Sequence, residues 1–182
     1  ARGRTGKIEG LILKKWYVLN EPFEDKKLIG YGIDFGFTND PSTLIEVRMQ
    51  DGELWIKELI YETGLTNQDL SHRMEILEVS RGALIVADSS EPKSIEELRR
   101  LRWTVDGVKK GKDSIMFGIN LLKGYTINVH ASSTNLIKEL EQYKWKVDRN
   151  GDSLNVPIDN YNHAIDALRY IIMHKFSKKG YG

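Results

Sequence analysis

The sequence contains no cysteine, so it can form neither disulfide bonds nor thiolate metal sites, and no thiol can act as a nucleophile. It also lacks a long apolar run. The longest wholly aliphatic stretch, residues 83–87, is far too short to cross a bilayer, and we see no secretory signal, so we predict no membrane partner. A large excess of one charge is missing as well. The net charge is +1, and any polyanion must therefore be bound by a local patch of bases.

The 182 residues are enough for one domain with a substantial core. Hydrophobic residues make up 40% of the chain and charged residues 29%, as in ordinary globular proteins. Residues 1–7 are basic, contain glycine and do not begin with methionine. We therefore expect residues 1–27 to be a linker or N-terminal extension of a longer protein, and residues 28–182 to form the domain.

Apolar periodicity and turn signals predict strands that first follow one another and then alternate with helices. An Asp-Gly turn at residues 51–52 joins the second and third strands into a meander. An Asn-Gly turn at residues 150–151 predicts a β-hairpin, and Asp159 is expected to cap a final helix that ends near residue 175. The expected strands cover residues 28–35, 43–49, 54–61, 83–87, 103–108 and 125–129. This order is that of a mixed α/β domain.

The first expected strand ends in a carboxylate that is surrounded by glycines. Residues 29–35 alternate between apolar side chains and glycine or aspartate, which is the period of a strand with one apolar face. Asp34 lies on the opposite face, between Gly32 and Gly36. Because the glycines leave the surface around the carboxylate open, a bulky charged ligand could approach the backbone closely. The pattern is typical of a metal or phosphate site, and also of a strand end followed by a turn.

Two further carboxylates lie where they could join Asp34. Asp88 follows the most continuous apolar strand, and ligand sites in α/β sheets lie outside the carboxyl ends of the strands. His163 and Asp166 are three positions apart on the final helix, so they share one face. If the three acids met, a hard cation would relieve their repulsion. The alternatives are that Asp88 caps the next helix, that Asp166 pairs with a base, and that His163 is an ordinary surface histidine.

These residues resemble the motifs of one family. The segments Ile33-Asp-Phe-Gly36, Asp88-Ser89 and His163-Ala-Ile-Asp-Ala-Leu-Arg-Tyr170 are similar to the nuclease domain of tailed-bacteriophage terminase large subunits. The resemblance covers about residues 28–175. It implies a ribonuclease H-like fold, in which helices flank a central mixed sheet of five strands in the order 3-2-1-4-5. It also implies that the hairpin at residues 150–151 is an addition to this fold near the active site.

The same resemblance implies a chemistry and a set of partners. Two Mg²⁺ or Mn²⁺ ions would be held by Asp34, Asp88 and Asp166, with His163 as a further ligand or catalytic group. The enzyme would cut concatemeric double-stranded viral DNA during genome packaging in the host bacterial cytoplasm. A full-length protein would add an N-terminal packaging ATPase and would work with the terminase small subunit and the portal. Here Gly6-Lys7 is followed by Ile8 and lacks the upstream glycine of a phosphate-binding loop, so we expect no ATP hydrolysis from this domain.

Clustered bases predict where DNA would bind. Phosphate contacts position DNA without reading its sequence, so we expect little intrinsic sequence preference. The alternative is that each cluster is an ordinary solvated face. The expected DNA-binding residues are Lys93, Arg99, Arg100, Arg102, Lys109, Lys110, Lys112, Lys144, Lys146 and Arg149.

Three other functions remain open. One is another ribonuclease H-like nuclease, such as a junction resolvase or an RNA–DNA hybrid nuclease. A second is half of an actin-like nucleotide-binding protein, because Asp34-Phe-Gly-Phe-Thr38 matches its Asp-x-Gly-x-Thr loop, although a second Asp-x-Gly-Gly loop is absent. The third is a DNA-binding module without catalysis.

Overall fold

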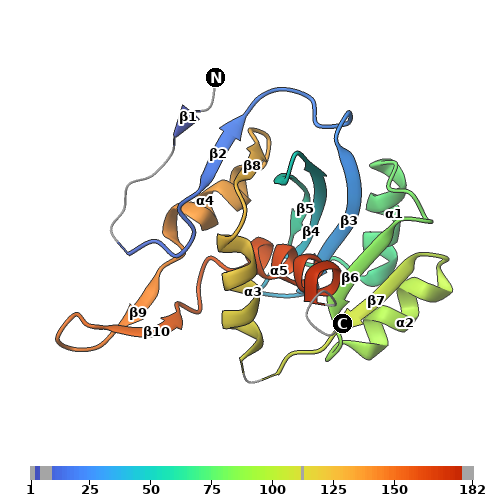
Figure 1. Cartoon of the computed structure of the whole chain (residues 1–182). Helices are drawn as coiled ribbons and strands as arrows, with labels where there is room; N and C mark the ends of the chain where they lie inside the picture. The colour runs from blue at the N-terminus through green and yellow to red at the C-terminus, as the bar shows by residue number, and fades with distance from the viewer. Residues whose placement is uncertain (1–2, 5–9, 112, 178–182) are drawn as a thin grey trace.

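We describe the fold from a computed structural model, which describes residues 3–4, 10–111 and 113–177. It is a mixed α/β domain with one eight-stranded sheet and a separate two-stranded hairpin (Figure 1). The strands are β1 (Gly3–Arg4), β2 (Trp16–Leu19), β3 (Lys27–Asp34), β4 (Ser42–Gln50), β5 (Glu53–Glu62), β6 (Leu84–Asp88), β7 (Thr104–Val108), β8 (Ile127–His130), β9 (Trp145–Val147) and β10 (Ser153–Pro157). The helices are α1 (Asn67–Ile76), α2 (Pro92–Arg100), α3 (Ser114–Lys123), α4 (Thr134–Gln142) and α5 (His163–Phe176).

The strand order of the large sheet is β1-β2-β8-β5-β4-β3-β6-β7. Its β5-β4-β3-β6-β7 portion has the expected 3-2-1-4-5 order, with the antiparallel meander on one side of β3 and the parallel strands β6 and β7 on the other. The sheet is wider than the five strands that were expected. Strands β8 and β2 continue it beyond β5 with parallel pairing, and β1 pairs with β2.

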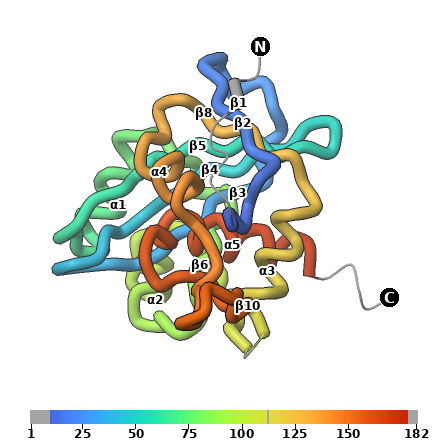
Figure 2. The backbone as a smooth tube through the Cα atoms, turned by 90° about the vertical axis from the view of Figure 1, so that its left-hand side faces the viewer, coloured from blue at the N-terminus to red at the C-terminus, as the bar shows by residue number. Residues whose placement is uncertain are grey.

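Helices cover both faces of the sheet, and each face has its own apolar core. Leu70 of α1 and Leu98 of α2 pack in one cluster with Ile33 and Ile85 of the central strands. On the other face, α3, α4 and α5 pack in a second cluster with β4, β5 and β8. Figures 1 and 2 show α5 lying against the middle of this second face, next to α3. Among the described residues, no helix is long and apolar enough to cross a membrane.

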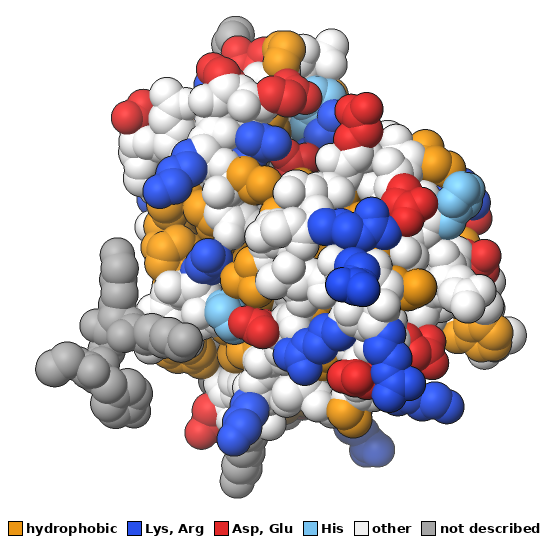
Figure 3. Space-filling view, turned by 90° about the vertical axis from the view of Figure 1, so that its right-hand side faces the viewer, with side chains coloured by type: hydrophobic (Ala, Val, Ile, Leu, Met, Phe, Trp, Pro, Cys, Tyr) orange, Lys and Arg blue, Asp and Glu red, His pale blue; other side chains and the backbone are white. Residues whose placement is uncertain are grey.

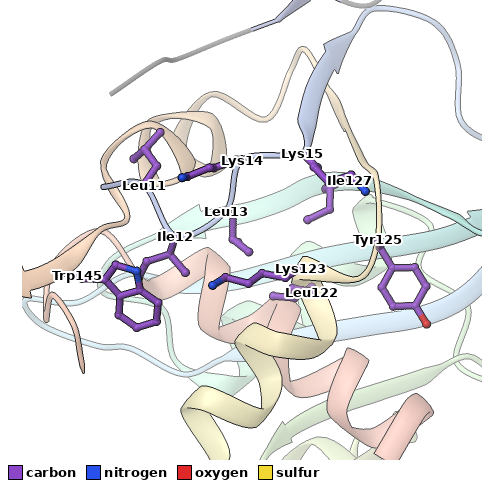
Figure 4. Close-up of a pocket in the computed structure, with 10 residues that line it drawn as sticks. All are labelled: Leu11, Ile12, Leu13, Lys14, Lys15, Leu122, Lys123, Tyr125, Ile127 and Trp145. Atoms are coloured by element: carbon purple, nitrogen blue, oxygen red, sulfur yellow. The ribbon is translucent and has the colours of Figure 1, made fainter. Parts of the chain in front are cut away.

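Part of the segment expected to be a linker packs into the domain. Strand β2 lies inside the sheet, between β1 and β8, and Trp16 is buried. Residues 11–15 lie beside the C-terminal end of α3 and Trp145 of β9, around a cavity of about 350 Å³ (Figure 4). The described residues that line this cavity include no acidic side chain. We therefore propose that the domain begins near residue 11 rather than at residue 28.

The hairpin forms at the expected Asn-Gly turn, where Gly151 has a φ of +84°. In this hairpin Val147 faces Ser153 and Trp145 faces Pro157, with an irregularity between the two pairs. The expectation that Asp159 caps the final helix is wrong. Helix α5 begins at His163, and Asp159 instead forms an ion pair with Lys146 at 2.7 Å, because residues 158–162 form a loop before the helix.

Helix α5 lies unusually close to strand β3, because Gly32 faces it. A Cβ atom at Gly32 would lie 1.8 Å from the carbonyl oxygen of Ala167, a distance at which two atoms clash. At Gly30, which has a φ of +147°, a Cβ atom would lie 3.0 Å from the side chain of Ile171. The expectation that Gly32 and Gly36 leave an open surface around Asp34 is therefore wrong, because α5 packs on Gly32 and the backbone of Asp40 and Pro41 packs on Gly36.

We predict that Gly32→Ala destabilises the domain by about 3 kcal/mol, because the helix must move away from the sheet to admit the methyl group. Denaturant unfolding of the two proteins measures the difference. Gly82→Ala is the matched control, since a Cβ atom there would meet nothing closer than 3.8 Å, and it should change stability by no more than about 0.5 kcal/mol. Equal stability of wild type and Gly32→Ala would contradict the close packing of α5 on β3.

Candidate active site

Asp34 and Asp88 end two strands that lie side by side. Strands β3 and β6 are parallel neighbours, with Tyr31 opposite Ile85 and Gly32 opposite Val86. Continuing this register by two residues sets Asp34 beside Asp88 at the carboxyl edge of the sheet. Since side chains alternate along a strand, both aspartates lie on the face that carries Gly32, which is the face covered by α5.

Helix α5 brings two more predicted residues to this edge. His163 is its first residue, and its Nδ1 atom lies 3.8 Å from the Asp34 carboxylate while its Nε2 atom lies 3.6 Å from that of Asp40. Asp166 lies in the first turn and is mostly buried. Further along the helix, the Tyr170 hydroxyl donates a hydrogen bond of 3.3 Å to Asp34. The four predicted catalytic residues therefore gather at one end of the sheet.

Each of the three carboxylates has a base beside it. Asp34 has His163, and Asp166 accepts a hydrogen bond of 3.1 Å from Arg169, whose side chain is 1% exposed. Asp88 forms an ion pair of 2.7 Å with Lys110, which comes from the segment between β7 and α3. The Ser90 hydroxyl and backbone N–H also donate to Asp88, at 2.7 and 3.0 Å. Within the described residues, no three His, Asp or Glu side chains already converge as a metal-binding group.

The charges at this edge influence one another. Burial raises the pKa of Asp166, and the neighbouring Asp34 carboxylate raises it further, against the opposing effect of Arg169. Burial also raises the pKa of Asp88, but Lys110 and Ser90 outweigh it, so the net pKa of Asp88 is lowered. Burial raises the pKa of Tyr170, and the negative charges of all three aspartates act on it in the same direction. Asp34 and Asp166 are therefore close enough to repel each other, and all three carboxylates act on Tyr170.

An open cavity of about 650 Å³ lies next to these groups, and it is large enough for part of a polymeric ligand. Asp34, His163 and Asp166 line it, together with Asp40 and Tyr61. Its opposite rim is the loop before α5, which includes Asp159. Because Lys146 of the hairpin forms an ion pair with Asp159, the hairpin lies at the edge of the same cavity. The expected position of the hairpin near the site agrees with this contact.

The expected DNA-binding residues that the structure describes reach the surface, and several of them form ion pairs with acidic residues of the same chain. Lys110 is bound to Asp88 and Lys146 to Asp159. Arg99 donates to the Val105 carbonyl and lies 3.6 Å from Asp106, and Arg100 pairs with Glu96 at 3.2 Å. Lys93, Arg102, Lys109, Lys144 and Arg149 lie elsewhere on the described surface, and Lys112 lies outside the described residues.

The sequence analysis missed several residues of this edge. Tyr170 was quoted only as part of a motif, and Asp40 and Tyr61 were given no role. Glu139 of α4 was also missed, although it is 1% exposed and accepts hydrogen bonds from Tyr61 and from the backbone of α5. One signal was available for Glu139. It lies between Leu136 and Leu140 on the apolar face of its helix, where a charged residue is unusual.

The comparisons with known proteins agree with this arrangement. The family model described as the terminase RNase H-like domain matches residues 34–174, a span that runs from Asp34 beyond Asp166 and Tyr170. The chain belongs to this family. The terminase large subunit of Bacillus phage SPP1 is 29% identical over an alignment of 165 residues, and the match covers 84% of this chain and 37% of that protein. The PBSX phage terminase large subunit of Bacillus subtilis is 26% identical over 81% of this chain and 34% of its own length.

Solved structures show the same fold. The large terminase nuclease domain from bacteriophage SPP1, determined with bound Mn, superposes with a TM-score of 0.77 and 24% identity, over 90% of this chain and 98% of that one. The nuclease domain of the P22 large terminase superposes with a TM-score of 0.65 and 13% identity, over 96% of this chain and 93% of that one. The large terminase nuclease from thermophilic phage G20c, with bound magnesium, superposes with a TM-score of 0.59 and 18% identity, over 86% of this chain and 85% of that one. This terminase domain spans about a third of the length of the curated relatives that it matches.

We predict that Asp34→Asn lowers the pKa of His163. The Asp34 carboxylate raises this pKa above its ordinary value of 6.5, outweighing the burial that lowers it. Protonated His163 therefore stabilises the fold fully below pH 6.5, and this contribution is lost as the pH rises through the raised pKa. An NMR titration of the four histidines measures the shift.

Asp51→Asn is the matched control for this titration. Asp51 is exposed in the turn between β4 and β5, at the other end of the sheet, and its φ of +52° is one that asparagine tolerates. It should leave the pKa of His163 unchanged. An unchanged His163 pKa in Asp34→Asn would show that the two side chains do not interact in solution.

Proposed function

We propose that this terminase domain is a metal-dependent endonuclease that cuts concatemeric double-stranded viral DNA during genome packaging. One observation supports this most strongly. Asp34 and Asp88 end adjacent parallel strands, and α5, seated on Gly32, brings Asp166 and His163 to the same edge. Asp34 and Asp166 repel each other beside an open cavity, and Asp88 ends the adjacent strand. Carboxylates gathered in this way are costly for a fold, and a catalytic cation is a physical reason to keep them.

The three carboxylates suit Mg²⁺ or Mn²⁺, both of which prefer oxygen ligands. We propose that Asp34, Asp88 and Asp166 hold two such ions in the catalytic complex, with His163 as an additional ligand or proton carrier. When bound, the ions would activate a water molecule and stabilise the charge that develops on the phosphate. The related SPP1 and G20c nucleases were determined with bound Mn and magnesium, which supports this choice of metal.

The remaining residues of the site would hold the carboxylates in position and neutralise their charge. The Tyr170 hydroxyl holds one oxygen of Asp34, and Arg169 holds one oxygen of the buried Asp166, so both carboxylates keep a fixed orientation. Lys110 neutralises Asp88 from an exposed segment, and its side chain is 40% exposed. When a cation replaces it on Asp88, Lys110 would be free to contact a DNA phosphate. His163, between Asp34 and Asp40, could hold a proton at Nε2.

Surface bases would bind the DNA backbone. Figure 3, which views the side formed by α1, α2 and β7, shows Lys and Arg side chains gathered over part of this face, with few acidic ones among them. Lys93 follows Asp88 by five positions in the sequence and lines a groove with Phe35, Asp40, Glu91 and Glu97. Contacts of this kind give affinity without sequence readout, so the choice of cleavage site would depend on the other packaging components.

The complete protein would be a terminase large subunit. A large terminase from another thermophilic bacteriophage, whose structures include complexes with ADP and with ATP-gamma-S, matches this chain over less than half of its own length. We propose that a packaging ATPase accompanies this domain in the same way, and that the full-length protein works with the small subunit and the portal in the host bacterial cytoplasm.

The direct test is cleavage of supercoiled plasmid by the purified domain with Mg²⁺, Mn²⁺, Ca²⁺ or EDTA. We expect nicking and linearisation with Mg²⁺ or Mn²⁺ alone. Asp34→Asn should reduce cleavage to background and Asp51→Asn should cut like wild type, because only the first removes a carboxylate from the site. Cleavage by Asp34→Asn, or metal-independent cleavage by wild type, would refute the proposal.

The same assay separates the rival enzymes. A terminase nuclease should cut linear duplex, whereas a resolvase would prefer a four-way junction and a hybrid nuclease an RNA–DNA duplex. Binding of DNA without cleavage in any metal would favour a non-catalytic module.

We also predict that DNA binding weakens steeply as salt increases, because phosphate contacts release counterions. Lys93→Ala should reduce the slope of log K against log salt by about 1, the value expected for one lost phosphate contact. Lys27→Ala, an exposed base at the opposite end of β3 from Asp34, should leave the slope unchanged. Identical slopes for Lys93→Ala and wild type would remove Lys93 from the DNA-binding surface.

A further inference from the structure

The first turn of α5 is capped by a residue from another helix. The N-cap residue of α5 is Asn162, and within the described chain its side chain makes no capping hydrogen bond. The first backbone N–H groups of a helix have no partner inside the helix, so a buried helix start needs acceptors from elsewhere. Here the acceptor is Glu139 of α4, whose carboxylate lies against the start of α5.

Glu139 accepts three hydrogen bonds and is 1% exposed. Its Oε1 atom accepts from the N–H of Ile165 at 3.0 Å, and its Oε2 atom accepts from the N–H of Ala164 at 3.1 Å. The Tyr61 hydroxyl, on strand β5, donates to Oε2 at 2.7 Å. The two N–H groups are those that the side chain of an N-cap residue would normally bind. Glu139 thus performs this capping from a distance of 25 or 26 positions in the sequence.

A buried carboxylate in this place is costly for the fold alone. Burial raises the pKa of Glu139, against the hydrogen bonds from Tyr61 and from the backbone of α5, which lower it. Asparagine is as good an N-cap residue as serine or aspartate, so Asn162 could have capped the helix without burying a charge, but its side chain makes no such bond. The sequence instead uses a side chain that connects three elements, β5, α4 and α5.

The two backbone N–H groups that Glu139 caps lie between His163 and Asp166, the proposed site residues of α5. Ala164 directly follows His163, and Ile165 directly precedes Asp166. The backbone of His163 is held from the other side as well, since the Thr43 hydroxyl of β4 donates to its carbonyl oxygen at 3.2 Å. Tyr61 lines the same cavity as Asp34, His163 and Asp166. Fixing the backbone between His163 and Asp166 fixes where both side chains enter that cavity.

We propose that Glu139 is a positioning residue of this site: by binding the N–H groups of Ala164 and Ile165 it holds His163 and Asp166 in the geometry that binds metal. The inference rests on the proposed function, because it assigns the metal to these residues. Glu139 itself is 1% exposed and is not among the described residues that line the cavity, so it would act through the backbone of α5.

The chain offers a matched control. Glu58 of β5 performs the same kind of capping on another helix, because its Oε1 atom accepts from the N–H of Leu136 at 2.8 Å and its Oε2 atom from the side chain of Asn135 at 2.9 Å. Both residues are in α4, which carries none of the four proposed metal-site residues. Glu58→Gln therefore reports the general cost of weakening a capping carboxylate, and Glu139→Gln adds the specific effect on α5.

The experiment compares wild type, Glu139→Gln and Glu58→Gln by calorimetric titration with Mn²⁺ alone, without DNA. The amide introduced by Glu139→Gln keeps one acceptor oxygen but directs an NH₂ group at a donor. We expect Glu139→Gln to bind Mn²⁺ at least about tenfold more weakly, the effect typical of losing an outer partner of a ligand. Glu58→Gln should bind Mn²⁺ like wild type, even where the two variants lose similar thermal stability.

Hydrogen exchange supplies a readout that does not need metal. In wild type, the amides of Ala164 and Ile165 should be protected like those in the middle of α5, and Glu139→Gln should expose them while Glu58→Gln does not. Fast exchange of these amides in wild type would overturn the proposal even if neither variant folded. Equal Mn²⁺ affinity in all three proteins would overturn it too. Failure of the proposed function is a different result, because wild type itself would then neither bind Mn²⁺ nor cut DNA.

Discussion

The contact between Gly32 of β3 and Ala167 of α5 is the constraint on which the site depends. No side chain larger than hydrogen fits between the strand and the carbonyl oxygen of Ala167. This contact sets the distance between helix and sheet, and so the distance between Asp34 on the strand and the residues in the first turn of α5. Glu139 and Thr43 then fix the start of the helix along its axis. Packing therefore sets the distance between α5 and the sheet, and hydrogen bonds set the position of the first turn of α5.

Features encoded over short stretches of sequence were predicted well. The alternating residues before Asp34 and the apolar run before Asp88 both formed strands as expected, because strand period depends on neighbours a few residues away. The Asn-Gly turn also formed a hairpin. The strand order did not follow from these signals. It came from the resemblance to terminase nucleases, since pairing between distant strands leaves little trace in local periodicity.

Features that depend on distant partners were missed or misjudged. Strand β2 has an apolar character that is compatible with an isolated hairpin, and only its pairing with β8 makes it part of the sheet. Asp159 has the chemistry of a helix cap, but Lys146 binds it before the helix begins. Glu139 has no local pattern that explains it, because all three of its partners lie on other elements. The separate prediction that Asp34, Asp88 and Asp166 bind metal still awaits experiment.

The position of α5 in the sequence has a consequence during synthesis of the chain. The bond between Tyr170 and Asp34 joins residues 136 positions apart, and contacts of such separation form late in folding. A ribosome extends a chain by about 5–20 residues per second, so the strands bearing Asp34 and Asp88 emerge several seconds before α5. Until α5 docks, the chain carries two of the three carboxylates and an uncovered sheet face. A nascent or truncated chain would therefore lack the complete site and be prone to aggregation.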